Sequence, residues 1–307
     1  MNIKRVIIKK LYGYINKDID VNKNINLLVG INGSGKTSVL NIINWLLVPS
    51  ITNLCANEFE KIELHFNYKS EDYISHTDTK RNLLEYVYHA VRQIALKRKL
   101  KLINAFNLED KNLLDIGCGT GDFLETALKA NWIVTGIEPD DNAREIANSK
   151  INNAVFKTEH LKKLKPNSFD VITLWHVLEH LPNLEHQISV FKSLLKPNGT
   201  LVIAVPNFKS YDAQHYKNFW AAYDVPRHFW HFSKTAIEKL FEKENIKLVK
   251  TLPMVFDAYY VSLLSEKYKS GFINPFKALW IGFRSNQKAK RSKEYSSHVY
   301  ILKSYNS

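Results

Sequence analysis

From residue 112 onward, short apolar segments alternate with helical ones, and this alternation restricts the fold of the chain most strongly. Strands are expected at residues 113–116, 133–137, 154–156, 169–174 and 199–205, with helices such as 121–129 and 141–150 between them. Strands separated by helices usually form a mostly parallel sheet with helices on both faces. The sequence therefore predicts a doubly wound α/β domain over residues 111–307.

The C-terminal part of this domain departs from the alternation. Two further strands are expected at 247–253 and 297–303, and the segment between them, near 254–293, is helical, aromatic and basic in pattern. One interpretation is a helix that caps a pocket, with its apolar face buried on the sheet. The other is an amphipathic helix that lies at a bilayer interface.

Two unlike segments precede the α/β domain. Residues 67–110 are helical and basic in pattern, with a helix expected at 79–102. In the N-terminal segment, residues 1–66, the pattern predicts strands at 3–8, at 25–29 and, at its end, at 61–68, and a helix at 36–48. We therefore predict three parts, 1–66, 67–110 and 111–307, of which 67–110 is the helical N-terminal part of the second domain. The length of the chain favours one large domain or two small ones.

The composition is that of an ordinary globular protein. Of 307 residues, 45% are hydrophobic and 24% are charged, which argues against a disordered chain. The two cysteines, Cys55 and Cys118, are too few for a disulfide framework or for a zinc site built from cysteines. Neither a secretory signal nor a membrane-spanning apolar run is visible. We therefore expect a cytoplasmic protein.

The positive charge is concentrated near the C-terminus. The formal net charge is +13, and residues 267–307 alone contain nine basic side chains and one acidic one. This segment is either a solvated basic surface or a surface that attracts anionic material such as phosphate, nucleic acid or lipid head groups. We predict no specific nucleic-acid partner, and a weak contact with a membrane surface stays open.

Residues 30–37 fit the phosphate-binding P-loop pattern G-x-x-x-x-G-K-[ST], between an expected strand and an expected helix. The residues that would contact a nucleotide are Gly30, Gly33, Gly35, Lys36 and Thr37. The glycines let backbone N–H groups surround phosphate oxygens, Lys36 would reach the terminal phosphates, and Thr37 would bind magnesium. Residues 1–66 resemble the N-terminus of ABC and recombination-repair ATPases, which implies ATP with magnesium as the ligand.

This resemblance covers a truncated piece. ATPases of that type also need a second strand ending in Asp-Glu and a signature loop, and neither is recognisable in the sequence. Hydrolysis requires positioned magnesium and an oriented nucleophile, so ATPase activity is not expected. The segment is predicted to be either a fusion remnant or a nucleotide-binding piece. A P-loop ATP-binding protein with a fused Rossmann-like module is the alternative interpretation of the whole chain.

A second glycine-rich loop, Asp115 to Gly121, ends a strand and opens a helix. Gly117, Gly119 and Gly121 permit a tight turn and the close approach of a ligand to the backbone. Glu138 follows about twenty residues later at the end of the next strand, where a carboxylate can accept both ribose hydroxyls of an adenosine ligand. The spacing G-x-G-x-G is one residue shorter than the dinucleotide-binding pattern, which disfavours NAD.

Residues 67–307 resemble class I S-adenosylmethionine-dependent methyltransferases, in the branch of the ubiquinone-biosynthesis O-methyltransferases. The resemblance rests on this loop, on Glu138 and on four later motifs. The later motifs are Phe169–Ile172, His176–His180, Leu195–Val205 and Asp224–Phe232. The resemblance implies a Rossmann-like sheet with an antiparallel last strand and S-adenosyl-L-methionine as the cofactor. It also implies methyl transfer (EC 2.1.1.-) to an unidentified small-molecule, lipid-linked or glycan acceptor.

The resemblance further implies roles for single residues. Asp115 would orient the loop and the methionine amino group, and Glu138 would hold the ribose. Trp175 and His176, just past the fourth strand, would border the methyl-transfer site. The predicted cofactor-binding residues are Asp115, Gly117, Cys118, Gly119, Gly121, Glu138, Trp175 and His176.

The sequence does not single out one catalytic residue. Candidates for a general base are His176, His180 and His228. The first two belong to an H-x-x-E-H run, an inverted zinc-peptidase pattern in which Glu179 would be the base. Because the run follows a strand of a sheet already expected to bind an adenosine ligand, no metal site is predicted. Methyl transfer from an activated sulfonium depends mainly on alignment, and a base is needed only for an acidic acceptor.

Overall fold

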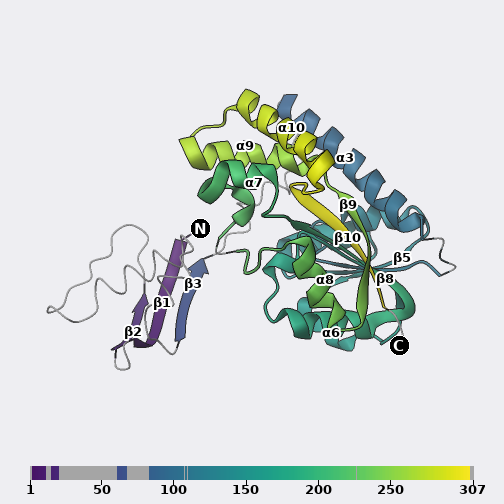
Figure 1. Cartoon of the computed structure of the whole chain (residues 1–307). Helices are drawn as coiled ribbons and strands as arrows, with labels where there is room; N and C mark the ends of the chain where they lie inside the picture. The colour runs from purple at the N-terminus through teal and green to yellow at the C-terminus, as the bar shows by residue number, and fades with distance from the viewer. Residues whose placement is uncertain are drawn as a thin grey trace. The chain divides into compact units, whose positions relative to one another are not determined.

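The computed structural model describes residues 2–11, 15–20, 61–67, 83–106, 108, 110–225 and 227–304 (Figure 1). The chain divides into two compact units, Met1–Ser75 and His76–Ser307. The strand expected at 25–29, the P-loop motif at 30–37 and the helix expected at 36–48 lie outside the described residues. Within the described ranges, no helix is both long and apolar enough to cross a membrane.

The N-terminal unit contains a three-stranded antiparallel sheet. The strands are β1 (Asn2–Leu11), β2 (Ile15–Asp20) and β3 (Lys61–Asn67), with β1 in the middle. Val6 and Ile8 of β1 are fully buried. The sequence analysis missed β2, because its pattern I-N-K-D-I-D offers few apolar residues. In the structure β2 pairs with β1, and Arg5 Nε of β1 donates a 2.7 Å hydrogen bond to Asp18 Oδ1 of β2.

The C-terminal unit is built on a seven-stranded sheet in the order β6-β5-β4-β7-β8-β10-β9. Its strands are β4 (Asn112–Ile116), β5 (Ile133–Ile137), β6 (Val155–Phe156), β7 (Phe169–Trp175), β8 (Leu195–Pro206), β9 (Ile246–Pro253) and β10 (Ser297–Ser304). The first five pair in parallel, whereas β10 runs antiparallel to both β8 and β9. The predicted doubly wound, mostly parallel sheet with an antiparallel last strand is confirmed.

Eight helices of the described residues surround this sheet. They are α3 (Leu83–Asn104), α4 (Asp122–Leu128), α5 (Asp141–Lys150), α6 (Leu184–Leu194), α7 (Tyr211–Tyr216), α8 (Lys234–Glu242), α9 (Asp257–Ser270) and α10 (Pro275–Ser292). Several begin at side-chain caps, as sequence rules predict. Asp140 accepts from the backbone N–H of Ala143 at 2.8 Å at the start of α5.

Alternate residues of each strand face two separate apolar layers. Along β8, Leu201 and Ile203 belong to the layer covered by α6 and α8, whereas Val202 and Ala204 belong to the layer covered by α3 and α4. Figure 1 shows α6 and α8 on one side of the sheet and α3 on the other. This alternation follows from the two-residue period of a strand, and it gives the sheet a buried apolar layer on each face.

The insert between β9 and β10 forms the helix pair α9 and α10, which lie side by side (Figure 1). Small buried residues of α10, including Ala278, Gly282 and Ser285, allow close packing. A Cβ on Gly282 would lie 2.9 Å from the Tyr259 Cα. Most of the large apolar side chains of α10 instead face solvent, for example Phe276, which is 85% exposed, whereas Ile281 is buried. The expected burial of the apolar face on the sheet is therefore wrong.

The buried carboxylate of Asp212 joins three elements around this insert. It accepts hydrogen bonds from Trp220 Nε1 at 2.8 Å, from Ser285 Oγ at 2.6 Å and from Ser296 Oγ at 2.7 Å. These donors lie next to α7, on α10 and just before β10. Because buried charges are stable only when hydrogen-bonded, this junction defines how the insert sits on the end of the sheet.

Candidate functional site

The candidate site lies at the carboxyl ends of β4, β5 and β7. The strand order reverses between β4 and β7, and in open α/β sheets ligands bind at this point, outside the carboxyl ends of the strands. The glycine loop leaves β4, Glu138 leaves β5, and Trp175 ends β7. The residues predicted to bind the cofactor therefore come together from three strands at one edge.

The glycine loop is held against the end of β5. The backbone N–H groups of Gly117 and Cys118 donate to the Ile137 carbonyl oxygen at 2.7 and 3.2 Å. Gly117, Gly119 and Gly121 all have positive φ, from 56° to 77°, which L side chains rarely adopt. A Cβ at Gly117 would also collide with the Val177 side chain. The loop conformation therefore requires these glycines.

Two members of the predicted cofactor set mainly serve packing. A Cβ on Gly121 would lie 2.9 Å from the Ala147 Cβ, so this glycine lets α4 approach α5. The Cys118 sulfur lies 2.8 Å from the position of a Cβ on Gly136, so the thiol packs on β5. Burial raises the pKa of the Cys118 thiol, which keeps it protonated and unreactive.

Glu138 holds the loop and the start of the following segment together. Its Oε2 accepts from the Gly119 N–H at 2.8 Å, and its Oε1 accepts from the Asp140 N–H at 3.0 Å. The side chain is 7% exposed, and burial raises its pKa above the usual range. Each carboxylate oxygen can accept a second hydrogen bond, so the group can still receive two hydroxyls.

Asp115 lies deeper, at the end of β4. It is 2% exposed, and its Oδ1 accepts from the Thr173 hydroxyl at 2.5 Å. Burial raises the pKa of Asp115 to about 7, although the Thr173 hydrogen bond and the nearby Lys99 oppose the rise. A carboxylate with so few polar partners is favourably placed to receive a ligand cation.

Lys99 of α3 was missed by the sequence analysis. Its Nζ lies 4.3 Å from the centroid of the Trp175 ring and 5.7 Å from that of Phe123, whose ring meets Trp175 edge to face. Burial lowers the pKa of Lys99 to about 8. The basic pattern of residues 67–110 indicated cations on this helix, but several lysines share it and no local signal selects Lys99.

His176 follows β7 with a left-handed φ of 58°, so it does not share a helix with His180. Its Nε2 lies 3.1 Å from Asp257 Oδ2 at the start of α9, and its Nδ1 lies 3.4 Å from Glu179 Oε1. Burial disfavours the imidazolium, but the two carboxylates outweigh this effect and raise the pKa of His176 to about 10. His176 is therefore protonated at neutral pH.

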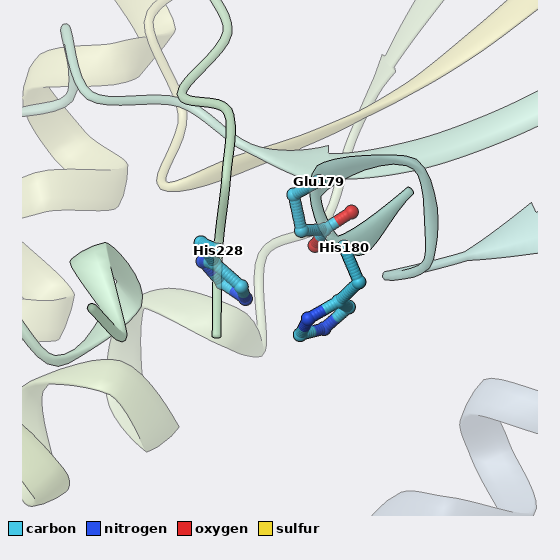
Figure 2. Close-up of side chains that lie close together, drawn as sticks. All are labelled: Glu179, His180 and His228. Carbon is cyan, nitrogen blue, oxygen red and sulfur yellow. The ribbon is translucent and has the colours of Figure 1, made fainter. Parts of the chain in front are cut away.

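Glu179, His180 and His228 converge beside the end of β7 (Figure 2). Glu179 and His180 lie on a 3₁₀ turn, η4 (Leu178–His180), whereas His228 comes from the loop before α8. One potential ligand atom of each residue lies within 4.8 Å of the others. The rings of His180 and His228 pack edge to face with centroids 4.5 Å apart, and burial lowers the pKa of His228. Sequence spacing could not pair His228 with His180.

The segment expected near an adenine edge forms a 3₁₀ turn, η3 (Thr158–Lys163), after β6. His160 on this turn stacks on the Phe156 ring with centroids 4.0 Å apart and an interplanar angle of 12°. A stacked pair beside Glu138 gives this side of the site a flat apolar surface, which suits contact with an aromatic base.

Comparison with known proteins agrees with this geometry. Residues 86–251, more than half of the chain, match a family model described as "Methyltransferase domain". The ubiquinone biosynthesis O-methyltransferase of Saccharophagus degradans is 35% identical over 105 residues, which are 32% of this chain and 44% of that protein. Its counterpart in Coxiella burnetii is 29% identical over 131 residues, which are 40% of this chain and 55% of that protein. The chain thus spans about half the length of the curated relatives it matches.

A solved structure shows the same fold. The magnesium protoporphyrin IX methyltransferase of Synechocystis PCC 6803 with bound SAH aligns with a TM-score of 0.50 at 15% identity, over 75% of this chain and 90% of that chain. At this identity the likeness concerns the fold alone. Taken with the family match, the strand order and the glycine loop, it places the chain in the methyltransferase domain family, among the Rossmann-like class I enzymes whose methyl donor is S-adenosyl-L-methionine.

Proposed function

We propose that the C-terminal unit binds S-adenosyl-L-methionine across the ends of β4 and β5 and transfers its methyl group to an acceptor. The observation that carries this proposal is the joining of the glycine loop to Glu138 at the switch point of the sheet. The bound donor would supply the activated sulfonium methyl group. The residues of the chain bind and align the reactants, which is the main requirement of an in-line displacement.

The residues present fit such a donor. Gly117 and Gly119 bring bare backbone to the site, and Glu138 is fixed by two N–H groups with free lone pairs for the ribose hydroxyls. Buried Asp115 would accept the methionine amino group, since a cation beside it offsets the cost of its burial. Lys99 and Trp175 would close the opposite wall and exclude water from the reacting groups.

The candidate bases differ in their fitness for that role. His176 is protonated at neutral pH because of Asp257 and Glu179, so it is poorly suited to accept a proton. His180 and His228 each direct Nδ1 at a backbone carbonyl, at 3.0 and 2.9 Å, which leaves Nε2 with a lone pair. We therefore assign the acceptor side of the site to His180 and His228.

Titration calorimetry with S-adenosylhomocysteine tests the donor site. We expect one binding site per chain and no competition by ATP. Gly119→Val should abolish binding, because a branched side chain would strain a φ of 56° and fill space beside the donor. Unchanged affinity in this variant would contradict the proposed donor site.

We also propose that the acceptor is lipid-linked and is met at an anionic membrane surface. The support is the exposed side of α10 and the residues just before it, called here the α10 surface. Its apolar members Phe272, Phe276 and Trp280 are 64%, 85% and 56% exposed. Arg284 and Lys288 are exposed on the same helix. A helix with exposed aromatic and basic side chains is suited to a bilayer interface.

Co-sedimentation with vesicles tests the α10 surface. The protein should bind vesicles of anionic lipid at low salt, bind neutral vesicles weakly, and dissociate as salt shortens the Debye length below about 10 Å at 0.1 M. Phe276→Ser should reduce binding, whereas Val249→Ser, at a 59% exposed site on β9, should not. A small-molecule or glycan acceptor is favoured instead if neither vesicle type retains the protein.

For the N-terminal unit we propose at most nucleotide binding at residues 30–37 and no ATP hydrolysis. The support is the sequence pattern alone, and the family match begins later, at residue 86. Phosphate release from ATP should stay at background level. A turnover that disappears in Lys36→Ala would overturn this proposal.

A further inference from the structure

A cleft lies at the open edge of the large sheet, beside β9, and is called here the β9 cleft. Its walls are residues 248–253 of β9, the start of α8 and the residues that lead into β10. Its volume is about 560 Å³, which falls within the range of small-molecule sites. In the sheet order β7, β8 and β10 separate β9 from β4, so the β9 cleft is distinct from the proposed donor site.

Buried polar side chains of β10 form the floor of the β9 cleft. His298 is 2% exposed, and its Nδ1 lies 3.2 Å from the Tyr300 hydroxyl oxygen. Its Nε2 lies 3.0 Å from the Lys293 carbonyl oxygen, so both ends of the ring have partners. Burial lowers the pKa of His298, and the ring is therefore neutral at neutral pH. The floor is polar but uncharged.

Thr251 of β9 presents unused hydrogen-bonding groups to the cleft. Its Oγ1 is buried and has no hydrogen-bond partner within the described part of the chain. The Met254 N–H donates to the Ser297 carbonyl oxygen at 3.1 Å, so residues 252 and 250, at two-residue intervals from it, also direct their backbone groups at β10. The N–H and carbonyl groups of Thr251 therefore point the other way, to the open edge. Pro253, which has no N–H, fits the same outward position.

Three exposed lysines surround the mouth of the β9 cleft: Lys234 on α8, Lys250 on β9, and Lys293 just after α10. The only acid among the lining residues is Glu238, whose Oε1 lies 3.8 Å from Lys234 Nζ. Three cations and one anion give the lining a net charge of +2. Ammonium groups, a hydroxyl and an outward N–H are all hydrogen-bond donors, and together they favour an anionic ligand.

The wall that precedes β10 is braced against the end of β8. Asn207, which is fully buried, donates from Nδ2 to the Tyr295 carbonyl oxygen at 3.0 Å and to Glu294 Oε2 at 2.8 Å. Its backbone N–H donates to the Ser296 carbonyl oxygen at 2.8 Å. A wall held in this way needs little ordering when a ligand binds, which lowers the cost of binding.

We propose that the β9 cleft binds the phosphate group of a small organic molecule. Lysines act as flexible point charges and can surround a group with up to two negative charges, whereas a single carboxylate is matched better by the planar fork of arginine. The phosphate would lie among the three ammonium groups and accept from the N–H and hydroxyl of Thr251. Glu238 would accept from a hydroxyl or amine of the same molecule. The proposal does not depend on methyl transfer.

Titration calorimetry of the full chain with glycerol 3-phosphate tests the site. We expect one saturable site with a Kd of about 1 mM or tighter, weaker binding of inorganic phosphate and no binding of glycerol. Lys250→Glu should weaken binding by about tenfold or more, because it replaces an attractive charge with a repulsive one. Lys247→Glu is the matched control, since Lys247 is exposed on the same strand but does not line the cleft. Its affinity should change less than about twofold.

Thr251→Val separates binding from stability. Valine keeps the shape of threonine but lacks the hydroxyl, so affinity for glycerol 3-phosphate should fall by about fivefold. The melting temperature of the ligand-free protein should not fall, because the lost hydroxyl has no partner there. A lower melting temperature with unchanged affinity would assign Thr251 a structural role and contradict its part in the site.

The remaining outcomes decide the location and the source of the phosphate. Absence of saturable binding in the parent protein would overturn the β9 cleft as a site. Equal affinities in folded Lys250→Glu and Lys247→Glu would also overturn it, since binding would then occur elsewhere, for example at residues 30–37. Displacement of glycerol 3-phosphate by anionic vesicles would identify a lipid head group as the source, and retention would identify a soluble molecule. Failure of S-adenosylhomocysteine to bind would overturn the proposed function and leave the β9 cleft standing.

Discussion

Glu138 Oε2 accepts a hydrogen bond of 2.8 Å from the backbone N–H of Gly119, so the acid at the end of β5 is coupled to the glycine loop at the end of β4. One side chain can thus fix the loop and also offer lone pairs to a ligand. The two halves of the predicted donor site should therefore respond together to mutation.

Replacing Glu138 with glutamine should weaken S-adenosylhomocysteine binding by about 1–3 kcal/mol, or roughly fivefold to 150-fold. The amide keeps the shape but can no longer accept from the loop and from two hydroxyls at once. Titration calorimetry measures the change. Glu159→Gln, at an exposed position on η3, is the matched control. Equal affinities for the two variants would show that Glu138 does not contact the donor.

Gly117→Ala should destabilise the protein more than Gly271→Ala does. Both glycines have positive φ, 68° and 80°, so alanine is strained at each by about 1 kcal/mol. A Cβ at Gly117 also collides with Val177, whereas nothing lies within 4 Å of one at Gly271. Chemical denaturation of both variants separates backbone strain from collision, and a smaller loss at Gly117 would contradict the described loop.

Asp115 should make the stability of the ligand-free protein fall as the pH rises from about 4 to about 7. Burial raises the pKa of its carboxyl from 3.8 to about 7, so over this range the folded state retains a proton that the unfolded state releases. The slope attributable to this group is at most about 1.4 kcal/mol per pH unit.

Denaturation of the parent protein and of Asp115→Asn across this pH range measures the effect. The amide does not titrate, so the stability of the variant relative to the parent should increase from pH 4 to pH 7. A constant difference between the two proteins would mean that Asp115 is ionised in the folded state throughout.

Asp212→Ala should cost about 3 kcal/mol or more of the free energy of unfolding, because it leaves the donors of Trp220, Ser285 and Ser296 without their acceptor. Asp141→Ala removes an exposed carboxylate that pairs with Lys157 at 3.0 Å and should cost less than about 1 kcal/mol. Denaturant titration compares them. Similar losses would show that the Asp212 junction does not hold the insert.

Local sequence patterns predicted most of the sheet. Apolar runs bounded by turn residues located β5 at Ile133–Ile137, and the helix expected at 141–150 coincides with α5. The pattern failed for β2, whose few apolar residues give no alternation, and for the exposed face of α10. In both cases the decisive contacts are with distant residues, and a local pattern does not contain them.

The sequence by itself determined the α/β fold, the glycine loop and the acid that follows it. These depend on residue type at short spacing, since positive φ requires glycine and a strand-end carboxylate needs only its place in the chain. Tertiary structure alone decided that Lys99 meets Trp175, that His176 meets Asp257, and that His228 rather than His176 faces His180. Each of these pairs joins segments that come together only when the helices and the insert pack on the sheet, because burial and distance are properties of the folded chain.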